Sequence, residues 1–234
     1  MNEKKNKVKN IFDSIAFKYD FLNHLLSFGF DKYWRRKALK LTGLTSDSIL
    51  LDVACGTGDV AIEAKKQGAS KIVGADLSHN MLQLFKDKSD WIDGSVVQTV
   101  AENMPFKYET FSNITVAFGV RNFYNIEEGF ASFYNLLKHG GKATIIEFQL
   151  PKNKIFKRLY RFYFNKILPI VGGLFSKNKT AYTYLPQSVK EFDEQIVISR
   201  LLKEVGFSKI ESYSLTFGIV QVLIAVKSSF NLKV

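Results

Sequence analysis

Short apolar runs alternate with helix-like segments along most of the chain, and this alternation constrains the fold more than any other feature of the sequence. We interpret the runs as buried strands and the segments between them as helices. Strands that alternate with helices are typical of a parallel β-sheet covered by helices on both faces. The sequence predicts seven strands, at Ile49–Val53, Lys71–Ala75, Ser95–Val100, Ile114–Phe118, Lys142–Phe148, Ile210–Leu215 and Val220–Lys227.

The expected helices lie over 8–26, 32–41, 59–67, Asn80–Lys88, Ile126–Leu137 and about 188–204. No linker rich in Pro, Ser or Gly divides the 234 residues, so a single domain is predicted. We expect four parts within it: a helical N-terminal extension over 1–45, a core over 46–150, an insertion over 151–186 and a C-terminal part over 187–234.

Composition excludes several classes of protein. With 46% hydrophobic and 24% charged residues the chain is neither disordered nor collagen-like. The single cysteine, Cys55, excludes an intramolecular disulfide and a cysteine zinc site, and fits a reducing cytosol. The three histidines do not cluster, so no metal is assigned. The basic N-terminus leads into no secretory signal and no run of about 18 apolar residues occurs, so we expect a cytoplasmic protein with at most peripheral membrane contact.

The charge balance restricts the partners. There are 33 basic and 22 acidic residues, a net charge of +11. An excess of this size favours an anionic partner: nucleic acid, a membrane surface or an anionic small molecule.

The most informative stretch is Leu51-Asp52-Val53-Ala54-Cys55-Gly56-Thr57-Gly58-Asp59, in which a strand enters a Gly-x-Gly turn and then a helix. In an open α/β sheet this turn lies at the carboxyl edge, where ligands bind. Glycines there allow the backbone to approach a ligand closely. The dinucleotide fingerprint would have a third glycine at position 61, where the chain has Ala61.

A second carboxylate, Asp76, ends the next strand, where it can accept hydrogen bonds from the two hydroxyls of a ribose. Nicotinamide cofactors and S-adenosylmethionine both carry that ribose. Asp52 and Asp59 flank the loop, and they would repel a pyrophosphate but suit the ammonium and sulfonium groups of S-adenosylmethionine.

Several motifs together resemble the ubiquinone/menaquinone biosynthesis C-methyltransferases, a class I S-adenosylmethionine-dependent family. Besides the loop at 51–59, these are Phe12-Asp13-Ser14-Ile15-Ala16-Phe17-Lys18-Tyr19-Asp20 with Asn23 and Trp34-Arg35-Arg36, Ala117-Phe118-Gly119-Val120-Arg121-Asn122, Gly140-Gly141, Glu147-Phe148 with Pro151, Tyr182-Thr183-Tyr184-Leu185-Pro186-Gln187-Ser188, and Leu215-Thr216-Phe217-Gly218-Ile219. The resemblance covers nearly the whole chain. It implies a Rossmann-like methyltransferase fold with an N-terminal helical lid and a helical insertion near 150–186.

The resemblance implies a set of site residues. Those expected to bind S-adenosylmethionine are Asp52, Gly56, Thr57, Gly58, Asp76, Val100, Ala101 and Ala117. Val100 stands where the family usually has Asp or Asn, so a side-chain acceptor for the adenine amino group is missing, although the backbone of Val100 and Ala101 can still contact the ring. Tyr19 and Asn23 on the lid, and Tyr182 and Tyr184 on the opposite wall, are expected to contact the acceptor; for the tyrosines, core packing is an equal alternative.

For a hydroquinone acceptor, removing or polarising the phenolic proton pushes electron density onto the neighbouring ring carbon. Arg121 is expected to stabilise the phenolate and Asn122 to orient it; a structural salt bridge is the alternative for Arg121. The sequence identifies no general base.

The segment between Phe148 and Lys190 contains no acidic residue and mixes basic with aromatic side chains. A helix over about 153–168 resembles an interfacial helix that docks on anionic lipid. A solvated basic face and an RNA-binding surface stay open as alternatives. The basic residues are Lys152, Lys154, Lys157, Arg158, Arg161, Lys166, Lys177, Lys179 and Lys190.

Taken with the resemblance, these patterns favour S-adenosylmethionine-dependent methylation of demethylmenaquinol to menaquinol at the inner face of the cytoplasmic membrane. The alternatives are the ubiquinone-branch acceptor 2-polyprenyl-6-methoxy-1,4-benzoquinol, an RNA methyltransferase, and a non-catalytic S-adenosylmethionine-binding module. No nucleic-acid partner is expected, because no RNA-binding module is appended, and a homodimer stays open.

Overall fold

The computed structural model describes residues 2–167, 170 and 179–228, without the side chains of residues 2, 179–183 and 194. Seven strands form one sheet in the order β3-β2-β1-β4-β5-β7-β6. Strands β1 to β5 pair in parallel, and β7 runs antiparallel to β5 and β6. The predicted seven-stranded, mostly parallel sheet is confirmed. The strands are β1 Ile49–Val53, β2 Lys71–Asp76, β3 Val96–Gln98, β4 Phe111–Ala117, β5 Leu137–Phe148, β6 Lys209–Leu215 and β7 Val220–Val226.

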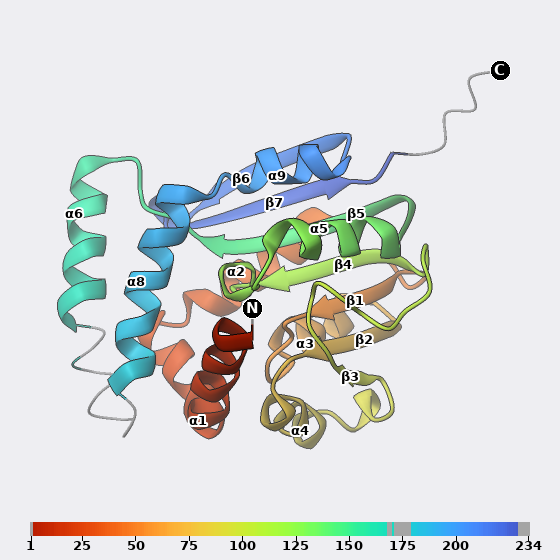
Figure 1. Cartoon of the computed structure of the whole chain (residues 1–234), viewed down its shortest axis with the longest axis horizontal. Coiled ribbons are helices and arrows are strands. Elements are labelled where there is room, and N and C mark those ends of the chain that lie inside the picture. The colour runs from red at the N-terminus through yellow and green to blue at the C-terminus, as the bar shows by residue number, and fades with distance from the viewer. Residues whose placement is uncertain (1, 168–169, 171–178, 229–234) are drawn as a thin grey trace.

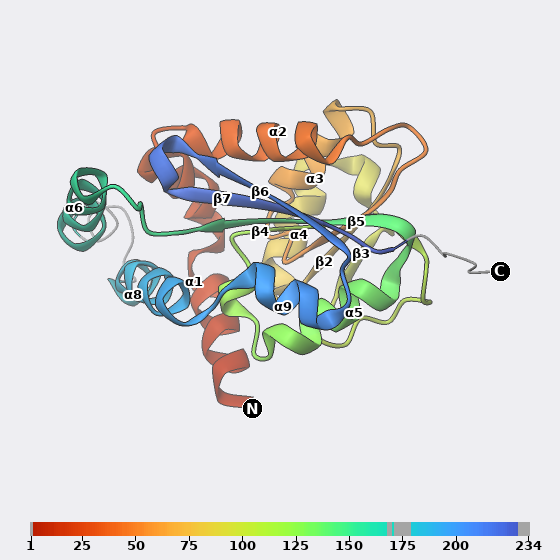
Figure 2. The same cartoon turned by 90° about the horizontal axis from the view of Figure 1, so that it is seen from above.

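Helices cover both faces of the sheet, with α2 and α3 on one side and α5 and α9 on the other (Figure 2). The helices are α1 Asn2–Leu26, α2 Phe30–Thr42, α3 Asp59–Lys66, α4 His79–Lys88, α5 Ile126–Leu136, α6 Lys154–Phe162, α8 Lys179–Gln195 and α9 Ile198–Val205, with short turns η1 Asp90–Ile92, η2 Val120–Asn122, η4 Thr216–Gly218 and a π-helical η3 Tyr163–Ile167. Each face has its own apolar core: Phe130 and Phe133 of α5 lie in one, and Leu39 of α2 and Phe85 of α4 in the other.

The predicted helix over about 188–204 is wrong in one respect: it is two helices, α8 and α9, separated at Val197, whose backbone is extended. Phe192 and Ile198 both pack in the core around α5. In one continuous helix these two positions would face about 120° apart. The break turns α9 so that its apolar face meets the same core. Helix α8 also runs across residue 186, where the insertion was expected to end.

Three strands differ from the expectation by two residues or more, and one of them, β4, begins at Phe111, three residues before the predicted Ile114. The predicted strand Ser95–Val100 is confined to Val96–Gln98, because β3 is an edge strand whose ladder with β2 covers only three pairs. Strand β5 begins at Leu137, five residues before the predicted Lys142, since Leu137 already pairs with Phe111. The expected N-terminal helices and the helix of the insertion are present as α1, α2 and α6.

The carboxyl ends of β1, β4 and β5 point toward the side of the molecule that carries α1 and α8 (Figure 1). Ligands of open α/β sheets bind at this edge. Among the described residues, no helix combines the length and apolarity needed to cross a membrane.

Candidate functional site

Two neighbouring cavities lie at the carboxyl edge of the sheet. The first, of about 820 Å³, is bounded by the loop after β1, the ends of β2 and β4, and α1. The second, of about 1530 Å³, lies between α1, α2, α6 and η3. Three side chains line both cavities, and the cavities therefore adjoin: Phe12, Tyr19 and Phe118.

The loop after β1 requires its glycines. Gly56 and Gly58 have φ of 54° and 85°, in the left-handed region. A Cβ at Gly58 would lie 2.0 Å from the ring of Phe85, so no larger residue fits without moving α4. Gly56 lines the first cavity, and its N–H donates to Asp76 Oδ2 at 2.8 Å.

Asp76 lies where the sequence predicts a ribose ligand, on the wall of the first cavity at the end of β2. Its other oxygen accepts a hydrogen bond from the N–H of Ser78 at 2.8 Å. Burial raises the pKa of the Asp76 carboxyl, against these two backbone donors. The carboxylate is thus fixed in orientation before any ligand arrives.

The predicted residues Val100, Ala101 and Ala117 line the same cavity. Glu102 follows them, and its Oε1 accepts hydrogen bonds from the N–H groups of Tyr124 and Asn125. The backbone around Val100 is thereby held against the segment after β4.

Asp52, Thr57 and Gly58 do not line either cavity. Asp52 is fully buried beneath the loop, where its Oδ1 accepts a hydrogen bond from the Thr115 hydroxyl at 2.8 Å. Its Oδ2 has no hydrogen-bond partner within the described part of the chain. Burial raises the pKa of Asp52 to about 7. Thr57 instead donates to Asp20 of α1 at 2.5 Å.

Arg121, expected as a catalytic charge, is buried on the wall of the second cavity. Its Nη1 lies 2.7 Å from Glu147 Oε1 and donates to the carbonyl of Phe118 at 2.5 Å. Its Nη2 and Nε bond to no described residue, and Nε is a buried, unpartnered donor. Arg121 therefore forms the salt bridge that was its alternative, and still presents unpaired N–H groups beside the cavity.

Asn122 and Tyr184 link the two cavities. Asn122 lines the first and Tyr184 the second, and the Tyr184 hydroxyl donates to Asn122 Oδ1 at 2.9 Å. Tyr19 bonds to Asn23, which also faces the second cavity, and burial raises the Tyr19 pKa. The side chain of Tyr182 lies outside the described residues.

Three residues of the site were missed by the sequence-based prediction of roles. Phe118 lies between the cavities with φ of 58°, a conformation that costs a non-glycine residue about 1 kcal/mol or more. Glu147 holds Arg121, and the sequence carried a signal for this role, since a carboxylate inside an apolar strand requires a partner.

Tyr160 of α6 lines the second cavity with a buried hydroxyl that has no partner among the described residues, and burial raises the pKa of this hydroxyl. No local pattern marks Tyr160.

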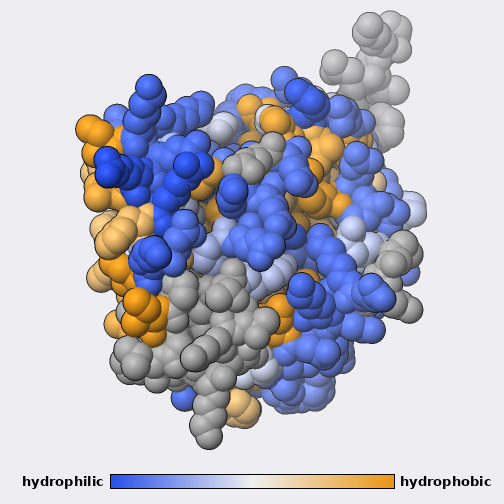
Figure 3. Space-filling view, turned by 60° about the vertical axis from the view of Figure 1, so that its left-hand side comes forward, coloured by the Kyte–Doolittle hydropathy of each residue, from blue (hydrophilic) through white to orange (hydrophobic). Residues whose placement is uncertain are grey.

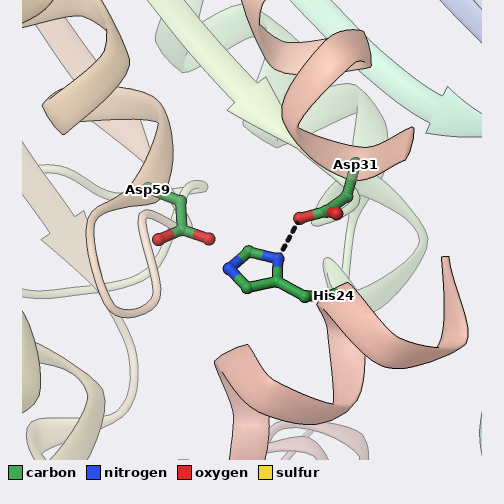
Figure 4. Close-up of side chains that lie close together, drawn as sticks. All are labelled: His24, Asp31 and Asp59. Carbon is green, nitrogen blue, oxygen red and sulfur yellow. Dashed lines mark hydrogen bonds and ion pairs between the residues drawn. The ribbon is translucent and has the colours of Figure 1, made fainter. Parts of the chain in front are cut away.

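An ionic network joins α1 and α2 to the loop. His24 Nδ1 and Arg35 Nη1 lie 2.6 and 2.5 Å from Asp31, and Figure 4 shows Asp59 facing the imidazole from the other side. His24, Asp31 and Asp59 have the composition of a metal site, with ligand atoms within 4.8 Å of one another. Their carboxylates are already paired, however, because Arg35 also lies 3.3 Å from Asp59 and Lys88 2.9 Å from it.

Comparisons with known proteins agree with this geometry. Residues 1–227 match the model of the ubiE/COQ5 methyltransferase family. A ubiquinone/menaquinone biosynthesis C-methyltransferase from Geotalea daltonii is 44% identical, over 95% of this chain and 97% of its own length. A demethylmenaquinone methyltransferase from Chlorobaculum parvum is 41% identical, over 95% of this chain and 93% of its own length.

Solved structures agree on the fold. A crystal structure from Thermotoga maritima, described as an S-adenosylmethionine-dependent methyltransferase and possible histamine N-methyltransferase, has a TM-score of 0.65 at 17% identity and covers 94% of this chain and 99% of that one. A phosphoethanolamine N-methyltransferase from Haemonchus contortus in complex with S-adenosylmethionine has a TM-score of 0.60 at 18% identity, over 83% of this chain and 52% of that one. The Rossmann-like methyltransferase fold is confirmed.

Proposed function

Because the chain belongs to the ubiE/COQ5 methyltransferase family, we propose that it methylates a ring carbon of a prenylated hydroquinone, with demethylmenaquinol as the acceptor. Membership of this family and the fold make it an S-adenosylmethionine-dependent C-methyltransferase of quinone biosynthesis. The observation that carries the proposal is the pair of adjoining cavities, which share Phe12, Tyr19 and Phe118 and have Arg121 beside them.

The residues of the first cavity fit S-adenosylmethionine, which supplies, when bound, a methyl group activated on a sulfonium. The Asp76 carboxylate, already oriented by two backbone N–H groups, suits the ribose hydroxyls. Gly56 leaves the backbone open to a ligand, and the cavity is walled near Val100 and Ala101 by apolar groups that suit a purine. Asp52 and Thr57 line neither cavity and would support the loop through their hydrogen bonds with Thr115 and Asp20.

The second cavity suits an apolar acceptor. Its walls are mainly aromatic and aliphatic, from Ile11 and Leu22 of α1 to Phe156 of α6. The positive charge of Arg121 would stabilise a phenolate oxygen of a quinol and so raise the nucleophilicity of the adjacent ring carbon. Asn122, held by Tyr184, would orient the same ring near the passage between the cavities. Holding both reactants in line contributes ~7–11 kcal/mol to lowering the barrier in well-oriented reactions.

The basic helix α6 supports a peripheral contact with the cytoplasmic face of a membrane. Ile155, Leu159 and Phe162 are exposed beside the exposed Lys154 and Arg158. Figure 3 brings forward this side of the molecule, where apolar and hydrophilic residues are interspersed. Basic groups with apolar neighbours dock reversibly on anionic lipid, at about 1 kcal/mol for each cation.

The test is incubation with methyl-labelled S-adenosylmethionine and a reduced, short-chain prenylnaphthoquinone lacking the ring methyl group. Label should enter the quinol, and the oxidised quinone should take up none, because it has no phenolate to form. Equal rates with a reduced prenylated 6-methoxybenzoquinone would favour the ubiquinone-branch acceptor. Label in RNA would instead indicate an RNA methyltransferase. Binding of S-adenosylmethionine without methyl transfer would indicate a non-catalytic module.

A further inference from the structure

A stripe of exposed apolar side chains runs along the outer face of α1 and into the turn that follows it. Phe17, Phe21 and Leu25 are spaced four residues apart and are 88%, 55% and 39% exposed, and Phe28 in the turn is 76% exposed. Residues at this spacing lie on one side of a helix. We call these four residues the α1 stripe. Ile11 and Leu22 lie on an adjacent side of α1 and are buried.

The conformation of Phe28 costs free energy that its own packing does not explain. Its φ is 53°, in the left-handed region, where a bulky residue is disfavoured by about 1 kcal/mol or more. Glycine would relieve this strain, yet the chain places a phenyl ring there and exposes most of it. Strained residues persist where surrounding structure or function requires them.

The α1 stripe reaches the mouth of the second cavity. Phe28 lines that cavity while being exposed, and so does Leu159 of α6. The Tyr163 hydroxyl donates to the carbonyl of Leu26 at 2.6 Å, and the rings of Phe28 and Tyr163 lie 5.8 Å apart. The end of α1 is therefore joined to η3, directly after α6, and the exposed residues Phe28 and Leu159 belong to one surface at the second cavity.

The charges around this surface are complementary to an anionic one. Asp20 and Asp31, the acidic residues between positions 14 and 40, are both engaged in ion pairs, with Lys88 at 2.8 Å and with Arg35 at 2.5 Å. Lys32 is exposed just after the turn, and α6 adds the exposed Lys154 and Arg158. Aromatic side chains among basic ones are typical of protein segments that lie in the headgroup region of a bilayer.

We propose that the α1 stripe inserts into an anionic bilayer, so that the mouth of the second cavity opens onto the lipid and the acceptor enters directly from it. This rests on the proposed function, and it adds an entry route to the membrane contact assigned to α6. A prenylated quinol resides in lipid, and its tail can stay there while the ring reaches Arg121. A short-chain, water-soluble quinol can reach the same cavity without a bilayer.

The experiment compares the wild type with the triple variant Phe17→Ser/Phe21→Ser/Leu25→Ser. The matched control is Tyr108→Ser/Val197→Ser, which removes exposed apolar side chains (74% and 53% exposed) away from both cavities. Binding is measured by co-sedimentation with vesicles of phosphatidylcholine with or without phosphatidylglycerol. Activity is measured with a long-chain quinol in the vesicles and with a short-chain quinol in solution.

We expect the triple variant to bind phosphatidylglycerol vesicles about tenfold more weakly, a loss of ~1.4 kcal/mol. Its kcat/KM for the long-chain quinol in vesicles should fall by a similar factor, whereas its kcat/KM for the short-chain quinol should stay within about twofold of the wild type. The control variant should match the wild type in every measurement.

Unchanged vesicle binding by the triple variant would overturn the proposal. So would sedimentation velocity showing a wild-type dimer that the triple variant converts to monomer, because the stripe would then be covered by a second copy. A wild type that binds vesicles but does not methylate the short-chain quinol would contradict the proposed function alone, and vesicle binding would still decide the role of the stripe.

Discussion

Arg121 and Glu147 form an ion pair between two buried side chains, with 2.7 Å between Nη1 and Oε1. Glu147 belongs to β5, and Arg121 belongs to the turn η2 that follows the neighbouring strand β4. The sheet therefore fixes the position of the guanidinium through Glu147. The pair leaves Nη2 and Nε of Arg121 without partners among the described residues, beside the second cavity.

We predict that Glu147→Gln lowers kcat by about tenfold or more, which corresponds to ~1.4 kcal/mol of transition-state stabilisation. Gln fills the same space but no longer holds Arg121 by charge, so the guanidinium loses its orientation. The control is Glu211→Gln, at a half-buried residue of β6 that pairs with the exposed Lys209 at 2.6 Å. Steady-state kinetics with thermal unfolding would check this, and a folded Glu147→Gln variant with wild-type kcat would show that the pair is only structural.

Gly58→Ala should destabilise the protein by ~2 kcal/mol or more and weaken S-adenosylmethionine binding, since the new Cβ would lie 2.0 Å from Phe85. Gly68→Ala is the matched control: its φ is also positive, but nothing lies within 4 Å of the added atom. That variant should lose only about 1 kcal/mol. Denaturant unfolding gives both free energies, and equal losses would mean that strain, and not the contact with Phe85, governs position 58.

Asp52 predicts a pH dependence of stability. Its folded-state pKa, raised by burial to about 7, lies above that of an unfolded chain, so the folded protein holds a proton that the unfolded chain releases. The contribution of Asp52 is fully present below the unfolded pKa and is lost as pH rises through about 7. Between the unfolded and the folded pKa of Asp52, the free energy of unfolding falls by about 1.4 kcal/mol per pH unit. Asp52→Asn should remove this slope, which unfolding curves from pH 4 to pH 8 would show; parallel curves for both proteins would contradict the assignment.

Tyr160→Phe should leave stability unchanged or raise it by about 1 kcal/mol, because it removes a buried hydroxyl that has no partner among the described residues. Tyr163→Phe removes the hydroxyl that bonds to Leu26 and should lower stability by about 1 kcal/mol. Unfolding of the two variants side by side tests the contrast. A destabilised Tyr160→Phe would indicate that the Tyr160 hydroxyl is bonded in solution.

The parts of the fold that the sequence predicted are those encoded locally. The strand, loop and helix from Ile49 to Lys66 follow from an apolar run, a Gly-x-Gly turn and helical spacing, and they form as expected. The break at Val197 could not be predicted, because it depends on which core Phe192 and Ile198 both reach.

The site shows the same division. Asp76, Val100, Ala101 and Ala117 line the first cavity because each lies at or just after the end of a strand, a position that sequence patterns reveal. Asp52 of β1 and Thr57 of the loop line neither cavity, because Asp52 bonds to Thr115 and Thr57 to Asp20. Those partners are distant in sequence, and so is the approach of α6 that brings Tyr160 to the second cavity.

Phe12 and Tyr19 lie two turns apart on α1, and each forms part of the wall of both cavities. Because one helix carries both side chains, any displacement of α1 changes the walls of both compartments at once. Release of the demethylated donor and release of the methylated ring would then both depend on where α1 lies.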